Sequence, residues 1–452
     1  MRRINLLLIT TVLFPICLRA QLNFVFPVGT AKGGAITAQA NDWESIGVSP
    51  SNLGWESNDR ISFTILNIGV SAQADQLTLP NVEKIINGKD TTMLERIASS
   101  HSGLNIYGNF IWAAFSVEIP KIGGFAISIC DRAFGNITMS PSITSNSQYQ
   151  TAFAAIASTA FTSQNAQKFN NNVNINTADS LQMLVNALNS FSGSYVSMYE
   201  FREINVDYGR ELFKIGSDDS TAFKFYGGIG LKYLIGLADI HGQFINGTVT
   251  ADYAIENNPI YSPIPSNAPG QGYGVDIGAS MVYKKWKFAI AATDIGSINW
   301  TGTHATLNDT VVAERIITDR SDSANSSNVK NYIQTNGEKF TTVLPSKFRL
   351  GASYKVNNMV TIASDVIMPL NNSVGNLIGT YYSIAGHLTL FKALILDAGF
   401  ATAKNYGVVM PMGIAFGHKV QIYFGVNDIL TYLGKTTNTD LSAAVGLIRV
   451  NL

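Results

Sequence analysis

The chain has 452 residues, of which 46% are hydrophobic and only 14% are charged, and its 31 basic residues balance its 31 acidic residues. Typical soluble domains carry roughly 25% charged residues, so the surface of a water-soluble protein of this size would be short of ions. The balanced charge argues against a nucleic-acid partner, and the 39 glycines argue against a bundle of membrane helices. A large all-β chain or a membrane β-barrel remains.

Residues 1–20 have the pattern of a secretory signal peptide. Arg2 and Arg3 precede an apolar run, Leu6–Ile16, and the small residue Ala20 stands at the expected cut. The run is too short to cross a hydrocarbon core of ~30 Å as a helix, and no later apolar stretch is long enough either. The mature chain keeps one cysteine, Cys130, so we expect no internal disulfide and no cysteine metal site.

Residues 21–58 are irregular and contain glycine and asparagine, so we interpret them as an amino-terminal segment before the strands. From residue 59 onward the main pattern is a period of two, which on a β-strand sends successive side chains to opposite faces. The clearest instance is residues 271–283, where apolar side chains share one face and glycines, Asp276 and Ser280 share the other.

Tyr273 and Tyr283 delimit the apolar face of this segment. Their separation is ~33 Å along a strand, which a tilt of ~40° projects to ~25 Å, the height of the apolar band of an outer-membrane barrel. Similar alternation recurs in residues 223–235, 347–356, 394–401 and 420–427. The sequence therefore predicts an all-β protein, a transmembrane antiparallel barrel in the bacterial outer membrane.

About 14 strands are predicted. The 14 expected starts and the closing segment together give 15 strands, one more than an even number. The expected starts are Arg60, Leu104, Ile122, Ser194, Thr221, His241, Gly272, Lys285, Leu344, Asn358, Tyr382, Ala393, Val408 and Val420, with a closing segment Ser442–Leu452. Either residues 241–255 or the strand near residue 60 is then wrong or lies outside the barrel.

Three polar stretches inside the barrel domain, 59–452, are expected to be long extracellular inserts. They are residues 79–101, 136–192 and 301–340. The second contains helix-like patches at Thr151–Phe161 and Ala178–Leu188. A soluble β-sandwich is the alternative fold, but its outward face would need charge and lysine-rich edges, which the narrow, glycine-rich polar face does not supply.

Several charged residues fall on the face that the alternation turns inward. We expect these side chains to line the lumen: Lys224, Lys232, Asp276, Lys347, Arg349, Asp365, His387 and Asp397, together with Lys355 and Arg449. A wet pore, a plugged pore and a structural ion network all predict such residues. Arg349 could attract a carboxylate or an anionic headgroup, but pairing with Asp365 on the next strand is the favoured interpretation.

The sequence offers no catalytic constellation, no cofactor motif and no metal site, so we do not expect an enzyme. The five histidines have no metal-ligand spacing, and no metalloprotease, nucleophile-elbow or phosphate-loop motif occurs. Some outer-membrane barrels hydrolyse lipids or peptides with a Ser–His or Asp–His pair, and His387 is expected near Ser383 and Asp397. A lumen histidine hydrogen-bonded across strands is the favoured interpretation.

Residues 42–55, DWESIGVSPSNLGW, resemble the N-P-A-type motif near the amino terminus of FadL-like outer-membrane proteins, in the form I-G-x-N-P-A-N-L-G. The matching positions are Gly47, Ser49, Pro50, Ser51, Asn52, Leu53 and Gly54, with Ser49 and Ser51 where the family has Asn and Ala. Residues 272–280, 294–300 and 344–365 also resemble strands of FadL-like and PorV-like barrels.

The resemblance implies a 14-stranded barrel whose amino-terminal segment, residues 21–58, folds into the lumen as a hatch. In the characterised members the hatch gates hydrophobic substrates such as long-chain fatty acids, which leave sideways into the membrane. Pro50 would fix a turn of the hatch, while Gly47 and Gly54 would allow close packing against the wall.

Two functions follow as hypotheses. The first is passive uptake of small hydrophobic or amphipathic molecules through a plugged lumen, with outer-membrane lipid and a hydrophobic ligand as partners. The alternative is a PorV-like scaffold that docks a secretion or surface-assembly complex through its extracellular inserts. Ligand uptake or a co-purified protein partner would separate the two.

Overall fold

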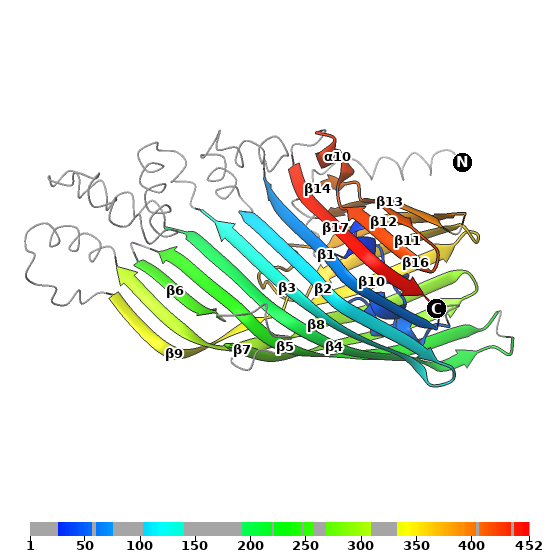
Figure 1. The fold of residues 1–452 in the computed structure, drawn as a ribbon, viewed down its shortest axis with the longest axis horizontal. Helices are drawn as coiled ribbons and strands as arrows, with labels where there is room; N and C mark the ends of the chain where they lie inside the picture. Colours follow the sequence, from blue (N-terminus) through cyan, green and yellow to red (C-terminus); the bar gives the residue numbers. More distant parts are fainter. Residues whose placement is uncertain are drawn as a thin grey trace, which may run out of the picture.

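The computed structural model describes residues 26–56, 60–75, 103–139, 192–218, 221–245, 248–255, 268–308, 332–391, 393–403, 406–434 and 438–451. Nearly all of their regular structure is β-strand (Figure 1). The strands are β1 Ile61–Asp75, β2 Leu104–Ile119, β3 Gly123–Thr138, β4 Ser194–Ile215, β5 Phe223–Ile245, β6 Thr248–Ile255, β7 Gly270–Tyr283, β8 Trp286–Asn308, β9 Tyr332–Val343, β10 Lys347–Lys355, β11 Val360–Pro369, β12 Tyr381–Leu390, β13 Leu394–Ala403, β14 Tyr406–Val409, β15 Met412–Phe416, β16 Val420–Val426 and β17 Asn438–Asn451. The helices are short: α2 Pro27–Ala31, η1 Asp42–Ser45, η2 Pro50–Gly54 and α10 Ile429–Tyr432. None of the helices in these ranges is long and apolar enough to cross a membrane.

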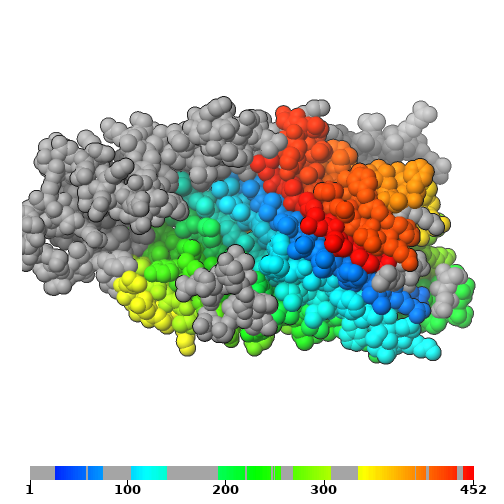
Figure 2. Space-filling view, viewed as in Figure 1, coloured from blue at the N-terminus to red at the C-terminus, as the bar shows by residue number. Residues whose placement is uncertain are grey.

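The strands form one closed antiparallel sheet. Strand β1 pairs with β2 on one side and with β17 on the other, so the last strand closes the ring against the first. Figure 2 shows this seam, with β17 in red beside β1 in blue. Three pairs of strands are collinear, β6 with β7, β9 with β10 and β14 with β15, so the 17 strands fill 14 positions of the ring. The predicted fold class, a barrel of about 14 strands, is confirmed.

The surplus predicted strand is explained by β5 and β6. His241 lies inside β5, which continues to Ile245, and β6 lies between β5 and β8 in the same ring position as β7. The expected start at His241 is therefore wrong, because the change of pattern there does not mark a turn. The strand near residue 60 is β1, a full member of the ring.

The expected insert at 301–340 is shorter than predicted, since β8 continues to Asn308 and β9 already begins at Tyr332. In β9, residues 334–339 are exposed on both faces, so no apolar alternation identifies them as a strand. The signal peptide, residues 1–20, the insert at 79–101 and nearly all of 136–192 lie outside the described residues, although β3 extends to Thr138.

The strands differ greatly in length around the ring. Strands β5 and β8 have 23 residues each, whereas β11, β12 and β13 have 10 each. Figure 1 shows the long strands on one side of the barrel and the short ones on the other. One end of the ring, the short-turn end, carries the turns that join β2 to β3, β7 to β8, β10 to β11 and β15 to β16, together with the start of β1 and the end of β17.

Aromatic side chains mark two levels on the outer surface. Near the short turns, Phe223 stacks on Tyr283 with ring centroids 3.9 Å apart. Further along the same strands, Tyr233 meets Tyr273 with centroids 5.6 Å apart. Between these levels the outward residues are apolar and exposed, as Ile277 is, whereas the neighbouring Asp276 is fully buried on the inner face. An apolar band between aromatic belts is the surface that a bilayer requires.

A lysine in place of Ile277 is expected to lower the free energy of unfolding in lipid vesicles by about 2–4 kcal/mol, the cost of a cation near the bilayer midplane. Ile277 lies on the outward face between the two aromatic levels. The matched control is Gln271→Lys on the same face beyond Tyr273, where the expected cost is about 0–1 kcal/mol. Urea unfolding followed by tryptophan fluorescence measures both, and equal effects would contradict a lipid-facing band.

Candidate functional site

The amino-terminal segment, residues 26–56, lies inside the ring. Its η2 turn contacts β3, β4, β5, β7 and β8, its η1 turn contacts β1, β2 and β3, and α2 contacts β1, β13, β15, β16 and β17. A short segment that touches strands on opposite sides of a closed sheet must occupy the lumen, and Figure 1 shows it in dark blue enclosed by the strands. Residues 48–53 are all buried.

The η2 turn sits on glycines of four neighbouring strands: Gly124 in β3, Gly209 in β4, Gly228 in β5 and Gly278 in β7. A Cβ atom at Gly209 or Gly228 would overlap the backbone of Pro50, and one at Gly124 would overlap the backbone of Leu53. The segment therefore approaches the wall backbone to backbone, which only glycine allows.

The residues of the amino-terminal motif all lie in or beside this turn. Pro50 is the first residue of η2, where its missing N–H is not needed. Asn52 Nδ2 donates to the carbonyl oxygens of Thr37 and Ala40, each at 2.8 Å. The φ of Gly47 is +69°, and a Cβ at Gly54 would lie 2.7 Å from the backbone of Arg210. Ser49, Ser51 and Leu53 are buried beside them.

Polar groups of the wall hold the segment on the side opposite η2. Asp365 accepts hydrogen bonds from the backbone N–H groups of Ile36 (3.2 Å) and Thr37 (2.9 Å). Arg349 Nη2 lies 3.5 Å from Asp365 Oδ2, as the sequence predicts, and Arg349 Nε donates to Thr37 Oγ1 at 2.9 Å. Tyr381 donates to the carbonyl oxygen of Gly33 at 2.9 Å.

Arg449 of β17 fixes the η1 turn through two carboxylates. Its guanidinium donates to Asp42 at 2.7 Å and to Glu44 at 2.5 Å. Burial raises the pKa of the Glu44 carboxyl to about 7, against the opposing charge of Arg449. The ionised fraction of Glu44 therefore falls as the pH drops below about 7, and the Glu44–Arg449 ion pair weakens with it.

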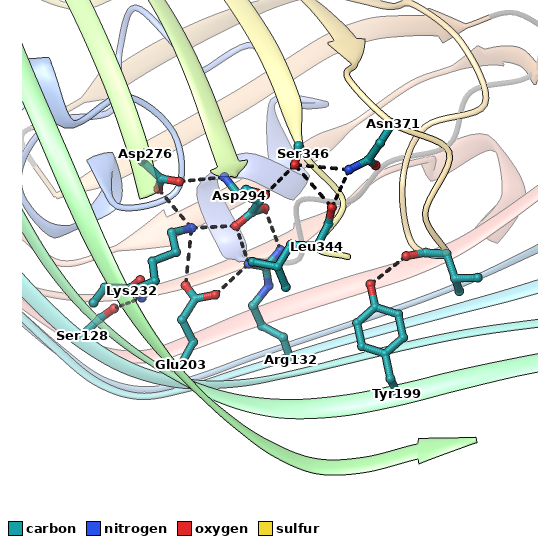
Figure 3. Close-up of polar contacts among 12 residues, drawn as sticks. Ser128, Arg132, Tyr199, Glu203, Lys232, Asp276, Asp294, Leu344, Ser346 and Asn371 are labelled. Atoms are coloured by element: carbon teal, nitrogen blue, oxygen red, sulfur yellow. Dashed lines mark hydrogen bonds and ion pairs between the residues drawn. The ribbon is translucent and has the colours of Figure 1, made fainter. Parts of the chain in front are cut away.

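A buried ion network joins side chains of five strands inside the barrel (Figure 3). Arg132 of β3 donates to Glu203 of β4 at 2.9 Å and reaches Asp294 of β8 with two bonds of 2.8 and 3.0 Å. Lys232 of β5 donates to Asp294 at 2.6 Å and lies 3.0 Å from Asp276 of β7. The Arg132–Asp294 contact joins β3 to β8, strands that are not neighbours, so the network crosses part of the lumen.

Sequence reasoning predicted Lys232 and Asp276 but missed three members of this network. Asp294 has a φ of +58° at a break in the β7–β8 register, so Thr293 and Asp294 both turn inward. Simple alternation cannot place both residues on one face. Arg132 follows the inward alternation of Ser128 and Cys130 and could have been found. Glu203 lies opposite Cys130 in the ladder, so that pairing places it on the same face.

The other predicted lumen residues are distributed along the barrel rather than gathered. Lys347 lines a small cavity together with Asp294. Lys224 lies near the short-turn end, 3.3 Å from the exposed Glu56. His387 and Asp397 meet near the same end, with His387 Nδ1 2.8 Å from Asp397 Oδ1.

His387 also contacts Thr389 Oγ1 through Nε2 at 3.2 Å, which gives a Thr–His–Asp chain. A second chain of the same kind joins Thr306, His304 and Asp252, with contacts of 3.1 and 2.7 Å. Because the same cross-strand arrangement occurs twice, at distant places in the sheet, we interpret both chains as structural. No group of three or more His, Cys, Asp and Glu side chains in the described ranges could hold a metal ion.

The β11–β12 connection, residues 370–380, enters the lumen from the end with the long connections. Tyr199 donates to the carbonyl oxygen of Val374 at 2.7 Å, and a Cβ at Gly375 would overlap the ring of Phe134. Leu377 is buried in the same apolar cluster as Ile36 of the amino-terminal segment. The lumen is therefore filled from both ends.

A cavity of about 80 Å³ remains between the segment and the ion network. Apolar residues of the segment line one part of it, among them Phe26, Trp43 and Val48, and Arg132 and Glu203 line another. An engineered apolar cavity of about 150 Å³ accommodates benzene. The cavity here holds a few water molecules at most, so a larger molecule can pass only if the segment or the 370–380 connection moves.

The closed ring, its outward apolar band and its plugged lumen define a transmembrane β-barrel of the outer-membrane type. Similar solved structures include a deltaS2S3 mutant of the monoaromatic hydrocarbon channel TodX, with a TM-score of 0.51, 10% identity, and coverage of 94% of this chain and 99% of that one. The Ralstonia pickettii toluene transporter TbuX gives a TM-score of 0.49 and 11% identity over 96% of this chain and 99% of that one. A Pseudomonas aeruginosa FadL homologue gives a TM-score of 0.46 and 9% identity over 96% of this chain and 99% of that one.

At 10% identity, the first of these similarities shows a shared fold. Residues 252–427 also match a family described as "Family of unknown function (DUF5723)". A comparison with curated proteins found no match. The resemblance of residues 42–55 to the hatch motif stays a prediction.

Proposed function

We propose that the protein is a FadL-like outer-membrane channel that admits small hydrophobic or amphipathic molecules, with residues 26–56 as its hatch. The observation that carries this proposal is the seating of the segment. It fills the lumen, yet it contributes no strand to the ring, which closes between β1 and β17 without it. Hydrogen bonds, ion pairs and close contacts with the wall glycines hold it in place. All of these can break while the barrel stays intact.

Two features of the lumen support a hydrophobic or amphipathic passenger. On the long-connection side, Tyr107, Phe134 and Tyr199 form a ring cluster with centroids 4.7 and 4.9 Å apart. Deeper in, the charges of Arg132, Lys232 and their carboxylate partners largely neutralise one another. A neutral solute that displaces water from paired ions costs less free energy than one that displaces water from isolated ions, since the paired ions already have partners.

A disulfide that locks the hatch tests the proposal. An ideal Cβ at Gly278 lies 3.3 Å from Ser51 Oγ, so cysteines at these two positions, in a Cys130→Ser background, are placed to bond. In proteoliposomes the oxidised variant should take up a labelled fatty acid no faster than vesicles without protein, and a reductant should restore uptake. The single variant Ser51→Cys is the control. Equal uptake by the locked and the reduced forms would disprove hatch gating.

A scaffold role is the second candidate, and strand β9 favours it. Within the described ranges β9 bonds only to β8, and its other edge receives no strand. An open strand edge is a place where another chain can pair. This function predicts a protein partner that co-purifies in stoichiometric amount and uptake that is unchanged when residues 26–56 are deleted.

A further inference from the structure

A second cavity, of about 320 Å³, opens at the short-turn end of the barrel. The amino-terminal segment lines one side of it, and the ends of β8, β10, β13, β16 and β17 line the other. Its volume falls at the lower end of the ~300–1,000 Å³ found for small-molecule sites. It is separate from the 80 Å³ cavity and lies on the opposite side of the segment from the 370–380 connection.

Cations outnumber carboxylates around this cavity. Its lining includes Lys32, Lys285, Lys287, Lys355 and Arg449, but only the carboxylates of Glu44 and Asp397. Both carboxylates already have partners. Glu44 accepts from Arg449 at 2.5 Å, and Asp397 contacts His387 at 2.8 Å, Lys32 at 3.7 Å and the hydroxyl of Tyr423.

Three lysines are left without a carboxylate. Lys285 Nζ donates to the carbonyl oxygen of Val356 at 3.0 Å, and Lys287 Nζ stands 3.9 Å above the centroid of the Trp55 ring. Across the described ranges, no Asp or Glu lies within ion-pair distance of Lys285, Lys287 or Lys355. A buried donor, Gln39 Nε2, also lacks a hydrogen-bond acceptor.

We propose that this mouth cavity is an oxyanion-binding site that takes the carboxylate or phosphate group of a small ligand. A concave surface lined by one sign of charge raises the local concentration of the opposite ion. The three lysines supply charged donors, and the Trp55 ring holds the Lys287 ammonium in place by a cation–π contact. The inference stands on the cavity alone and does not require that the barrel transports its ligand.

Calorimetric titration of the purified full-length barrel in a non-ionic detergent at low salt tests the proposal. Inorganic phosphate and hexanoate are the two probes. The double variant Lys287→Gln/Lys355→Gln should weaken binding about tenfold or more, since each removes a charged donor. Lys224→Gln is the matched control, because Lys224 is also near the short turns but pairs with Glu56 and does not line the cavity. It should leave the affinity unchanged.

The two probes distinguish the source of the anionic group. Tighter binding of hexanoate than of phosphate would assign the site to the acid group of an amphiphile, and the reverse order would assign it to a phosphate. No binding of either probe to the unmodified protein, or equal weakening by Lys224→Gln and the double variant, would overturn the proposal. Gln39→Leu, which removes the buried donor and no charge, gives a second measurement if the double variant fails to fold.

Discussion

Asparagine in place of Asp294 is expected to lower the free energy of unfolding of the barrel in lipid vesicles by about 3–5 kcal/mol, as removal of one partner from a buried ion pair usually does. Asp294 receives two bonds from Arg132 and one from Lys232. The neutral amide removes the carboxylate that accepts these three bonds, and Arg132 Nη2 loses its charged acceptor inside the lumen. The midpoint of urea unfolding, followed by tryptophan fluorescence, measures the loss.

Glu56→Gln is the control for this change, because it also converts a paired carboxylate to an amide. The Glu56 side chain is 76% exposed and lies 3.3 Å from Lys224. Exposed pairs contribute about 0–1 kcal/mol, so the expected loss is small. If the two variants unfolded at the same urea concentration, the network across the lumen would make no special contribution to stability.

Valine in place of Gly228 is expected to unseat the amino-terminal segment while the ring stays closed. A Cβ at this position would overlap the backbone of Pro50. Backbone atoms cannot move away through a change of side-chain rotamer. Overpacking of this kind costs about 1–3 kcal/mol, and because each 1.4 kcal/mol is about tenfold in an equilibrium, the seated state is disfavoured by roughly 5- to 140-fold. Faster swelling of proteoliposomes in sugar solution and protease cleavage within residues 26–56 would report the change.

Gly386→Val provides the matched control, since a Cβ there has no neighbour closer than the carbonyl oxygen of Ala398, at 3.9 Å. It adds the same side chain to a barrel strand without touching the segment. Swelling that rose equally in both variants would show that valine disturbs the wall itself, and an unchanged rate in Gly228→Val would show that the segment does not limit permeation.

The barrel could be predicted from the sequence because its outer surface must be apolar over a fixed height. Residues 271–283 show this directly, since Tyr273, Ile277 and Tyr283 lie on the face that meets lipid. Outside the apolar band the constraint disappears. Residues 334–339 of β9 are exposed on both faces, and β5 passes through the expected start at His241 without a turn. Water on both sides of a strand leaves no alternation to detect.

The site was predicted only in part, because alternation gives the face of a residue but not its neighbours across the ring. Lys232 and Asp276 were expected inside, yet nothing in the sequence tells which of the other strands carries their partners. Arg132 and Asp294 are 162 positions apart in the chain. Their contact depends on the order of the ring and on the backbone irregularity at Asp294, which turns a carboxylate inward out of phase with the strand.

The unequal strand lengths have a consequence for how the molecule sits in its membrane. Strands of 10 residues, such as β11, β12 and β13, rise only ~25 Å at a tilt of ~40° and just match the hydrocarbon thickness. Strands of 23 residues, such as β5 and β8, rise ~58 Å and stand well clear of it. The short strands have no length to spare, so they fix how deeply the barrel is inserted in the bilayer. The long strands therefore extend beyond the bilayer on one side of the barrel only, and the described wall is low over β11, β12 and β13.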